Sequence, residues 1–255
     1  MKQLWVEQYR PKTLDGYVFV DQTQRDQVAA WVEQKSIPHL LLSGSPGTGK
    51  TTMAKMLINE LGVDEYDVLY VNGSKEGSKI EWVDKLIGFC QTMPFGTFKV
   101  VLIDEADYLT PVSVQPAMRN LMEDYSQTVR FILTCNYPNK IIAALHSRTQ
   151  GFHVDNLDKE QFVTRAATIL LSEGVDLNEE NLEILDEYVT VTYPDLRKCI
   201  NLLQQNCTGT ELKRPSSSSG SGSADYLVQA VALFKAGKIH DARKIICESA
   251  TPEDY

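Results

Sequence analysis

Short apolar runs alternate with longer stretches of helical periodicity along the first 151 residues. Four aliphatic runs bounded by polar or glycine-containing turns are predicted strands, namely His39–Ser43, Val68–Asn72, Lys99–Asp104 and Val129–Cys135. Apolar residues that recur every three or four positions predict helices over Gln22–Gln34, Lys50–Leu61, Ser78–Gln91 and Pro111–Tyr125. This alternation is typical of a parallel sheet with crossover helices, so the predicted fold class is α/β.

Two of these helices carry start signals. Ser78 followed by Glu81 forms a capping box, and Thr110 before Pro111 places a capping residue next to a proline at the first helical position. We therefore expect these helices to begin at Ser78 and Pro111.

After about residue 152 the strand pattern gives way to helical spacing. Helices are predicted over Lys159–Glu173, Asn178–Tyr188 and Asp195–Gln205. The predicted organisation is a nucleotide-binding domain at 1–151 and a small all-helical lid at 152–213.

A Ser/Gly segment follows the lid. Residues 214–223 contain Ser216–Ser223, which holds only Ser and Gly and is predicted to be a flexible linker, either natural or introduced by engineering. Beyond it, Asp225–Phe234 and Ile239–Ser249 predict a helical hairpin that turns at Gly237. Residues 224–255 are thus expected to begin a further helical domain without completing it.

The composition is globular. Of 255 residues, 43% are hydrophobic and 23% charged, which excludes a fully disordered chain. No apolar segment is long enough for a membrane span and the N-terminus lacks a secretory signal, so a cytoplasmic protein is expected. The five cysteines are scattered singly, a spacing that argues against a zinc site.

Charge is distributed unevenly. The net charge of −9 argues against nonspecific coating of nucleic acid. Residues 1–151 hold 15 basic and 17 acidic side chains, whereas residues 152–255 hold 10 and 17. Any contact with DNA or RNA is therefore expected from a local patch in the first part.

A phosphate-binding loop is the most specific motif. The segment Gly44–Thr51 fits GxxxxGK[ST] between a predicted strand and a predicted helix. Its main-chain N–H groups and the helix N-terminus suit phosphate, and we expect Lys50 to reach the β- and γ-phosphates and Thr51 to bind Mg²⁺. The predicted nucleotide contacts in this region are Ser45, Pro46, Gly47, Thr48, Gly49, Lys50, Thr51 and Thr52.

A second motif ends in acids. The segment Val100–Asp107 is an aliphatic run that finishes with Asp104 and Glu105, as in a Walker B strand. Asp104 is predicted to hold Mg²⁺ and Glu105 to activate the attacking water. A buried strand that simply ends in surface carboxylates is the alternative, and the partnership with Lys50 argues against it.

The strand candidate before Asn136 ends in an amide at the same edge of the sheet, where it is suited to positioning the lytic water. By itself this is a weak signal, because Asn at a strand end commonly makes a turn. The three elements in this order resemble the AAA+ ATPase family, in which Asn136 is similar to sensor 1.

Further segments resemble sliding-clamp loaders. Trp5–Asp15 resembles the opening of replication factor C small subunits, where this segment lies against the adenine, and this resemblance implies contacts from Tyr9, Arg10 and Pro11. His146–Thr149 resembles their Ser-Arg-Cys motif, with Thr149 in place of Cys. In that family the Arg, here Arg148, acts as a finger on ATP held by the neighbouring subunit.

The segment Pro194–Lys198 resembles the sensor 2 motif of the same family, which implies that Arg197 contacts the γ-phosphate from the lid. The resemblance covers residues 5 to about 207. Val71–Ser74 followed by Lys79 is most similar to the ATPase subunit of T-even-type phage clamp loaders. That similarity implies the cytoplasm of an infected bacterium as the location.

A possible DNA contact lies at the head of the helix predicted from Ser78. Lys75 and Lys79 suit a phosphate backbone, which proteins grip through lysines and helix N-termini; a solvated capping turn is the alternative. In related loaders a matching Lys contacts DNA or restrains the Walker B Glu, with a Gln coupled to it. Lys79, Glu105 and Gln115 fall at the corresponding places.

The resemblance implies an ATP hydrolase that uses ATP and Mg²⁺ in a hetero-oligomeric ring to open a sliding clamp and load it onto primer–template DNA. The alternatives are a nucleotide-gated assembly scaffold and another AAA+ DNA motor of the branch-migration helicase type. Because such loaders end in a helical collar that this chain mostly lacks, the chain alone is expected to be monomeric or weakly associated.

Overall fold

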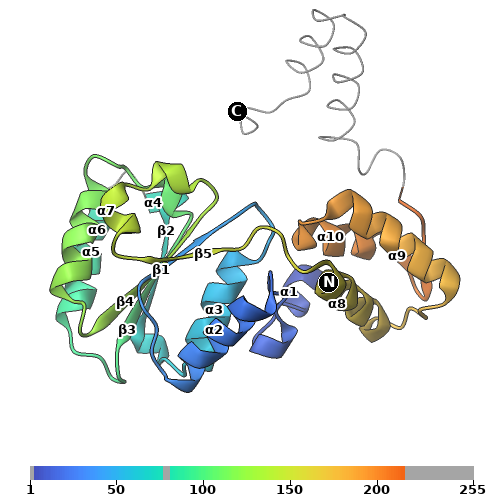
Figure 1. Ribbon diagram of the computed structural model, residues 1–255, viewed down its shortest axis with the longest axis horizontal. Helices are drawn as coiled ribbons and strands as arrows, with labels where there is room; N and C mark the ends of the chain where they lie inside the picture. The colour runs from blue at the N-terminus through green and yellow to red at the C-terminus, as the bar shows by residue number, and fades with distance from the viewer. Residues whose placement is uncertain (1–2, 77–80, 216–255) are drawn as a thin grey trace, which may run out of the picture.

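A computed structural model describes residues 3–76 and 81–215 of the chain. Its centre is a five-stranded sheet in the order β2-β3-β4-β1-β5, in which every described pairing is parallel (Figure 1). The strands are β1 Leu40–Ser43, β2 Val68–Asn72, β3 Lys99–Asp104, β4 Val129–Cys135 and β5 Gln150–His153. The four predicted strands are present, β1 starting one residue late, and the predicted α/β class is confirmed.

Each face of the sheet carries its own core, because side chains alternate along a strand. Leu40 and Leu42 of β1 belong to one buried cluster, which helices α2 (Gln22–Glu33) and α3 (Lys50–Glu60) complete. Leu41 belongs to the other, with α5 (Glu81–Gln91), α6 (Val114–Asp124) and α7 (Ala143–His146). The sheet is thus covered by helices on both faces (Figure 1).

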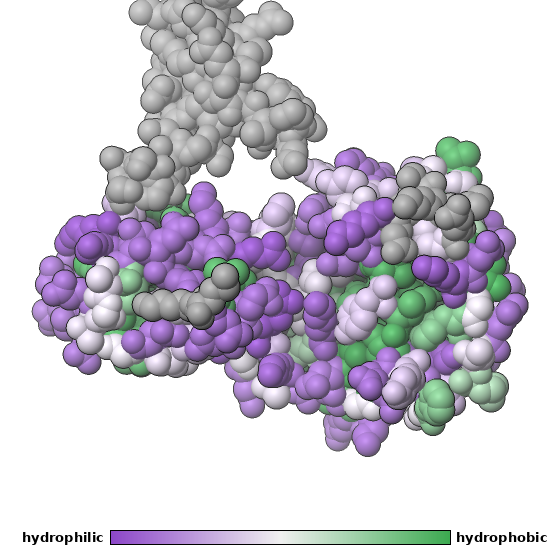
Figure 2. All heavy atoms as spheres, turned by 180° about the vertical axis from the view of Figure 1, so that it is seen from behind, coloured by the Kyte–Doolittle hydropathy of each residue, from purple (hydrophilic) through white to green (hydrophobic). Residues whose placement is uncertain are grey.

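A helical lid follows the sheet. It consists of α8 (Lys159–Ser172), α9 (Glu179–Thr192) and α10 (Leu196–Asn206), and a small hairpin of β6 (Cys207–Thr208) and β7 (Glu211–Leu212) comes after them. The first core cluster runs without a break into the lid, where it includes Phe162 and Tyr188. Polar side chains cover most of the visible lid surface (Figure 2), as the acidic composition of this part suggests.

The N-terminal helix α1 (Trp5–Gln8) packs on the lid and not on the sheet (Figure 1). The main-chain N–H of Trp5 donates to Gln204 Oε1 on α10 at 3.0 Å, and Gln204 Nε2 donates back to the carbonyl of Gln3 at 3.0 Å. The two ends of the described chain are therefore tied together. The shorter elements are α4 (Gly73–Glu76) and the 3-10 turns Leu14–Gly16, Glu65–Asp67, Ala106–Tyr108 and Pro138–Lys140.

Several predicted boundaries differ from the structure. The start of α6 at Pro111 is wrong, since the carbonyl of Thr110 accepts from the amides of both Val114 (3.1 Å) and Gln115 (3.2 Å), which widens the turn, and the helix begins at Val114. Strand β5 was not predicted and runs across the boundary placed at residue 151. The capping box at Ser78, the linker at 216–223 and the hairpin beyond it lie outside the described residues.

No helix in the described ranges combines the length and the apolar character that crossing a membrane requires.

Candidate functional site

The loop between β1 and α3 has the backbone that the glycine pattern predicts. Gly47 has φ 78° and Gly49 has φ 96°, both in the left-handed region that side chains rarely adopt. Gly49 is the N-cap of α3, and its carbonyl accepts a hydrogen bond from the Tyr17 hydroxyl at 3.5 Å. The loop therefore turns directly into the N-terminus of α3, where amide groups point outward.

Lys50 lies inside this loop. Its Nζ donates to the carbonyls of Gly44 (2.8 Å) and Ser45 (2.7 Å), and the residue is only 8% exposed. Burial lowers the pKa of the ammonium group, and the positive charge of Arg197 lowers it further, against the opposing effect of nearby acids. The cation is thus held where the loop curves, with two carbonyl partners that phosphate oxygens can replace.

Asp104 is fixed by two hydroxyl groups. Its Oδ1 accepts from Thr51 Oγ1 at 2.7 Å and from Thr134 Oγ1 at 2.5 Å. Thr134 Oγ1 also accepts from the main-chain N–H of Glu105 at 3.1 Å. The first turn of α3 and the ends of β3 and β4 therefore meet at one carboxylate, and Thr134 is a site residue that the motifs did not indicate.

Glu105 follows Asp104 with φ 57°, an unusual value for a residue other than glycine. Such a conformation turns the chain sharply at the strand end. Glu105 and Asn136 line the same polar pocket beside the loop, together with Pro46, Gly47, Gly49, Lys50, Thr51, Asp104, Thr134, Cys135 and Arg197. This pocket brings together two cationic side chains, two hydroxyls, two carboxylates and an amide at one edge of the sheet.

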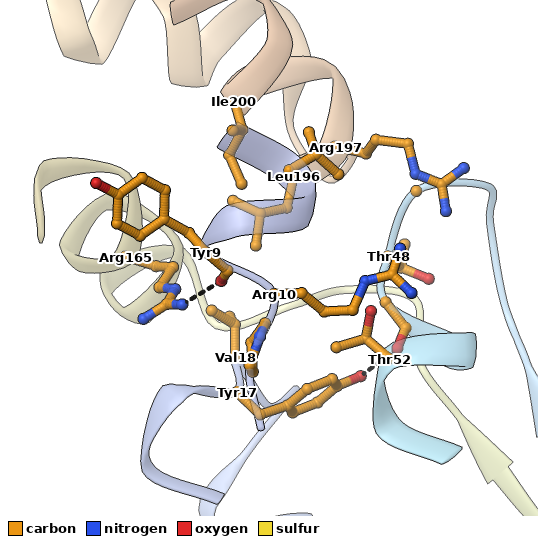
Figure 3. A pocket seen from close by; sticks show the side chains of 14 residues that line it. Tyr9, Arg10, Tyr17, Val18, Thr48, Thr52, Arg165, Leu196, Arg197 and Ile200 are labelled. Carbon is orange, nitrogen blue, oxygen red and sulfur yellow. Dashed lines mark hydrogen bonds between the residues drawn. The ribbon is translucent and has the colours of Figure 1, made fainter. Parts of the chain in front are cut away.

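A second and more apolar pocket lies between the N-terminal segment, the loop and the lid (Figure 3). Tyr9, Arg10, Pro11, Thr48 and Thr52, all expected from the sequence, line it. It is completed by Val6, Tyr17, Val18, Gly47, Gly49, Arg165, Leu196, Arg197 and Ile200.

The lid holds the N-terminal segment at this pocket. Arg165 of α8 donates to the carbonyl of Tyr9 at 2.6 Å, as the dashed line in Figure 3 marks, and the Tyr9 hydroxyl donates to Glu173 at 2.7 Å. Sequence reasoning missed Arg165, because an isolated Arg in a helix carries no signal of its partner.

Val18 lines the same pocket. The residue is 5% exposed, and the amides of its two neighbours are hydrogen-bonded: Tyr17 N donates to Leu14 O, and Phe19 N donates to Gln161 Oε1. Among the described residues, no group donates to the carbonyl of Val18 or accepts from its amide. The main-chain amide and carbonyl of this pocket residue therefore have no hydrogen-bond partner within the described part of the chain.

Arg197 lines both pockets and extends from α10 toward the loop (Figure 3). It lies two residues after Asp195, the N-cap of α10. A single guanidinium of the lid therefore faces the junction of the apolar pocket and the polar one.

Arg148 does not line either pocket. Its guanidinium pairs with Glu123 of α6, with Nε donating at 2.8 Å, and Nη1 donates to the carbonyl of Ala144 at 2.8 Å. The hydrogen bond from Arg148 lowers the pKa of Glu123. This arginine lies on another face of the same chain.

The remaining predicted residues lie apart from the pockets. Ser45 is on the outer side of the loop, where its N–H (2.5 Å) and hydroxyl (3.0 Å) donate to Asp155. Lys75 is exposed in α4, and Lys79 lies outside the described residues. Gln115 is fully buried and bonds main-chain groups of Leu109, Lys140 and Ile142.

Comparison with known proteins identifies the family. A model of the ATPase family associated with various cellular activities (AAA) matches residues 40–154. A replication factor C small subunit of Sulfurisphaera tokodaii is 43% identical over 208 residues, which are 79% of this chain and 61% of that protein. One from Staphylothermus marinus is 38% identical over 252 residues, 96% of this chain and 75% of that protein. The chain belongs to the replication factor C small-subunit family.

The resemblance to clamp-loader subunits is thereby confirmed, while the closer similarity to phage subunits stays a prediction. The chain spans 61% of the length of the Sulfurisphaera tokodaii small subunit and 62% of that of a relative from Aeropyrum pernix. Among solved structures, a RuvB variant of Thermotoga maritima matches with a TM-score of 0.60 and 20% identity, over 85% of this chain and 71% of that one. At that identity the match shows the fold alone.

Proposed function

We propose that this chain is an ATPase subunit of a DNA polymerase sliding-clamp loader. In this proposal it binds Mg·ATP at a subunit interface, helps to open a clamp, and hydrolyses ATP as the clamp closes on primer–template DNA. The observation that carries the proposal is the meeting of Lys50, the Thr51–Asp104 pair and Glu105 in one pocket of a replication factor C family member.

The apolar pocket fits an adenine base. In this proposal the unbonded main-chain amide of Val18 would donate to N1 of adenine, and its carbonyl would accept from the 6-amino group. Guanine carries a carbonyl and an N–H at those positions and is mismatched. Phosphates of a base held there extend past Gly47 toward Lys50 and the N-terminus of α3.

The polar pocket fits Mg²⁺. A hydroxyl and a carboxylate within 2.7 Å of each other are oxygen ligands of the kind that this ion prefers. In the described part of the chain, no three His, Cys, Asp or Glu side chains form a metal cluster. Thr51 and Asp104 would hold the ion together with phosphate oxygens and water, and the ion would neutralise charge that develops on the phosphates.

Hydrolysis requires a base beside the attacking water. Glu105 is the carboxylate of the pocket that does not bond Thr51, so it remains to accept a proton from water. The Asn136 amide lines the same pocket and is suited to orienting that water. The Glu105 main chain is anchored on Thr134, which holds the carboxylate near the phosphate end of the pocket.

A second protomer completes the site in this proposal. Arg148 is remote from its own pockets but sits partly exposed at the surface, with a side chain that is 25% accessible. A guanidinium in that place is suited to reach ATP bound by an adjoining subunit, as an arginine finger does.

Two surface features support DNA and clamp contacts. Lys75 is exposed at the end of β2, where a phosphate backbone can approach. Met93 and Phe95, in the loop between α5 and β3, are 80% and 81% exposed, which is typical of a protein-binding surface. These residues are candidates for primer–template and clamp contacts respectively.

The test is an ATPase assay with the chain, its partner subunits, clamp and primed DNA. The expected result is turnover that clamp and primed DNA stimulate, and that Lys50→Ala and Glu105→Gln abolish. Glu33→Gln, an exposed change at the end of α2, serves as the matched control and keeps full activity. Turnover that survives Glu105→Gln contradicts the water-activation role, and nucleotide-driven assembly without any turnover favours a scaffold.

A further inference from the structure

A carboxylate of the lid rests on the phosphate-binding loop. A Cβ atom at Gly47 would lie 1.9 Å from Asp195 Oδ1 and 2.3 Å from Asp195 Cγ. These distances are far below any contact between real atoms, so Asp195 packs directly on the Cα of Gly47. Gly47 is required by its φ of 78°, and a larger residue there would in addition displace the Asp195 carboxylate.

The same carboxylate begins the helix that carries Arg197. Asp195 Oδ1 accepts from the main-chain N–H of Lys198 at 2.8 Å, the bond that caps the first turn of α10. Because a capped first turn is rigid, the contact between Asp195 and the phosphate-binding loop determines the position of the Arg197 Cα.

Arg197 in turn faces the phosphate end of the site. It lines both pockets, and its charge acts on the Lys50 ammonium inside the loop. A shift of α10 along the loop would move the guanidinium away from that position while leaving the base pocket largely intact.

We propose that Asp195 is a positioning residue that docks the lid on Gly47 and so places Arg197 against the terminal phosphate of the bound nucleotide. This inference rests on the proposed function of the pocket. Its consequence is that the preference for ATP over ADP depends on a side chain that touches the loop rather than the phosphates.

A purely structural role as a helix cap is the competing explanation, and the lid provides a matched control for it. Asp158 caps α8 in the same way, with Oδ1 accepting from Gln161 N at 2.9 Å. It does not line either pocket. Asp158→Ala thus removes an equivalent cap without removing the contact on Gly47.

The experiment measures ATP and ADP affinities of the full chain by calorimetry with Mg²⁺. Asp195→Ala is expected to lower the ratio of ATP to ADP affinity about tenfold, the size of one lost charge-assisted hydrogen bond. Asp158→Ala is expected to leave the ratio unchanged. Asp195→Asn keeps both the cap and the side-chain volume, so it is expected to keep the wild-type ratio of ATP to ADP affinity.

A second variant tests the same inference if Asp195→Ala folds poorly. Asp195→Ser retains a capping hydroxyl but is too short to fill the place of the carboxylate on Gly47, so it too is expected to lose the preference. The inference is overturned if Arg197→Ala lowers the ratio while the Ala and Ser variants of Asp195 do not. A wild-type chain that binds neither nucleotide would instead refute the proposed function.

Discussion

Thr51 Oγ1 donates to Asp104 Oδ1 at 2.7 Å, across 53 residues of sequence. This bond joins the first turn of α3 to the end of β3, and Thr134 of β4 orients the same carboxylate from the other side. The candidate metal position is thus built from residues of α3, β3 and β4.

The hydroxyl of Thr51 is predicted to be needed for hydrolysis. Thr51→Ala removes both the hydrogen bond to Asp104 and a Mg²⁺ ligand, so ATPase activity is expected to fall by roughly 10²-fold or more, comparable to losing another group that stabilises transition-state charge. Thr51→Ser keeps the hydroxyl and is expected to retain most activity. Turnover measured across a Mg²⁺ titration checks this, and equal activity of the Ala and Ser variants would contradict it.

The guanidinium of Arg148 is predicted to act only in an assembly. Arg148→Ala is expected to leave nucleotide affinity of the isolated chain unchanged, because the residue lines neither pocket. ATPase activity of the assembled loader is expected to drop roughly 10³-fold, as for other arginine fingers. Arg119→Ala is the control, since Arg119 Nε lies 4.0 Å from Oε1 of the same Glu123. A loss of nucleotide binding by the isolated Arg148→Ala chain would count against a role in trans.

The main chain of Val18 is predicted to select adenine over guanine. ATP is expected to bind at least about tenfold more tightly than GTP, since guanine leaves both Val18 groups mismatched. Val18→Ala removes part of the apolar lining but keeps the main chain. It is therefore expected to weaken the binding of both nucleotides and to preserve the ratio of ATP to GTP affinity. Competition binding with the two nucleotides measures this, and a ratio near one in the wild type would exclude base selection here.

Protonation of His39 is predicted to destabilise the fold. Burial, and then the charge of Arg130, lowers the pKa of His39, whose Nδ1 accepts from the Phe131 amide at 3.1 Å. Since the unfolded chain takes up this proton more readily, the stability from neutral His39 is present above about pH 6.5 and is lost as pH falls toward the folded pKa.

Urea unfolding at pH 7.5 and pH 5.5 tests that prediction. His39→Asn, which can supply an acceptor oxygen in place of Nδ1, is expected to lose less free energy of unfolding between the two values than the wild type does. His146→Asn changes an exposed histidine and is expected to behave as the wild type. An unchanged pH dependence of the free energy of unfolding in His39→Asn would show that another group causes the loss of stability at low pH.

The sequence predicts those parts of the site whose signal is local. The loop at Gly44–Thr51 and the acids after β3 are recognisable because each motif lies within one strand-to-helix or strand-end segment. Strand β5 escapes prediction, since Phe152 is its one buried residue and no alternation is visible. Thr134 and Arg165 escape for another reason: their roles come from contacts with Asp104 and Tyr9, which are distant in sequence.

The positions of Arg148 and Asp195 illustrate the same limit. A family resemblance indicates both segments. The spacing of residues in the sequence, however, predicts neither the ion pair of Arg148 with Glu123 nor the contact of Asp195 with Gly47. Such relationships depend on how the lid and the sheet meet, and packing between distant segments decides that.

The double tie of the N-terminal segment to the lid has a consequence for turnover. Arg165 and Glu173 form hydrogen bonds with Tyr9, and Gln204 forms hydrogen bonds with Gln3 and Trp5. The N-terminal segment that lines the apolar pocket is therefore attached to the lid. In the proposed ATPase cycle, any lid movement that releases nucleotide would carry the first residues of the chain with it. On that proposal ADP would leave between the lid with its attached N-terminal segment and the sheet, and an external restraint on the N-terminus would slow turnover.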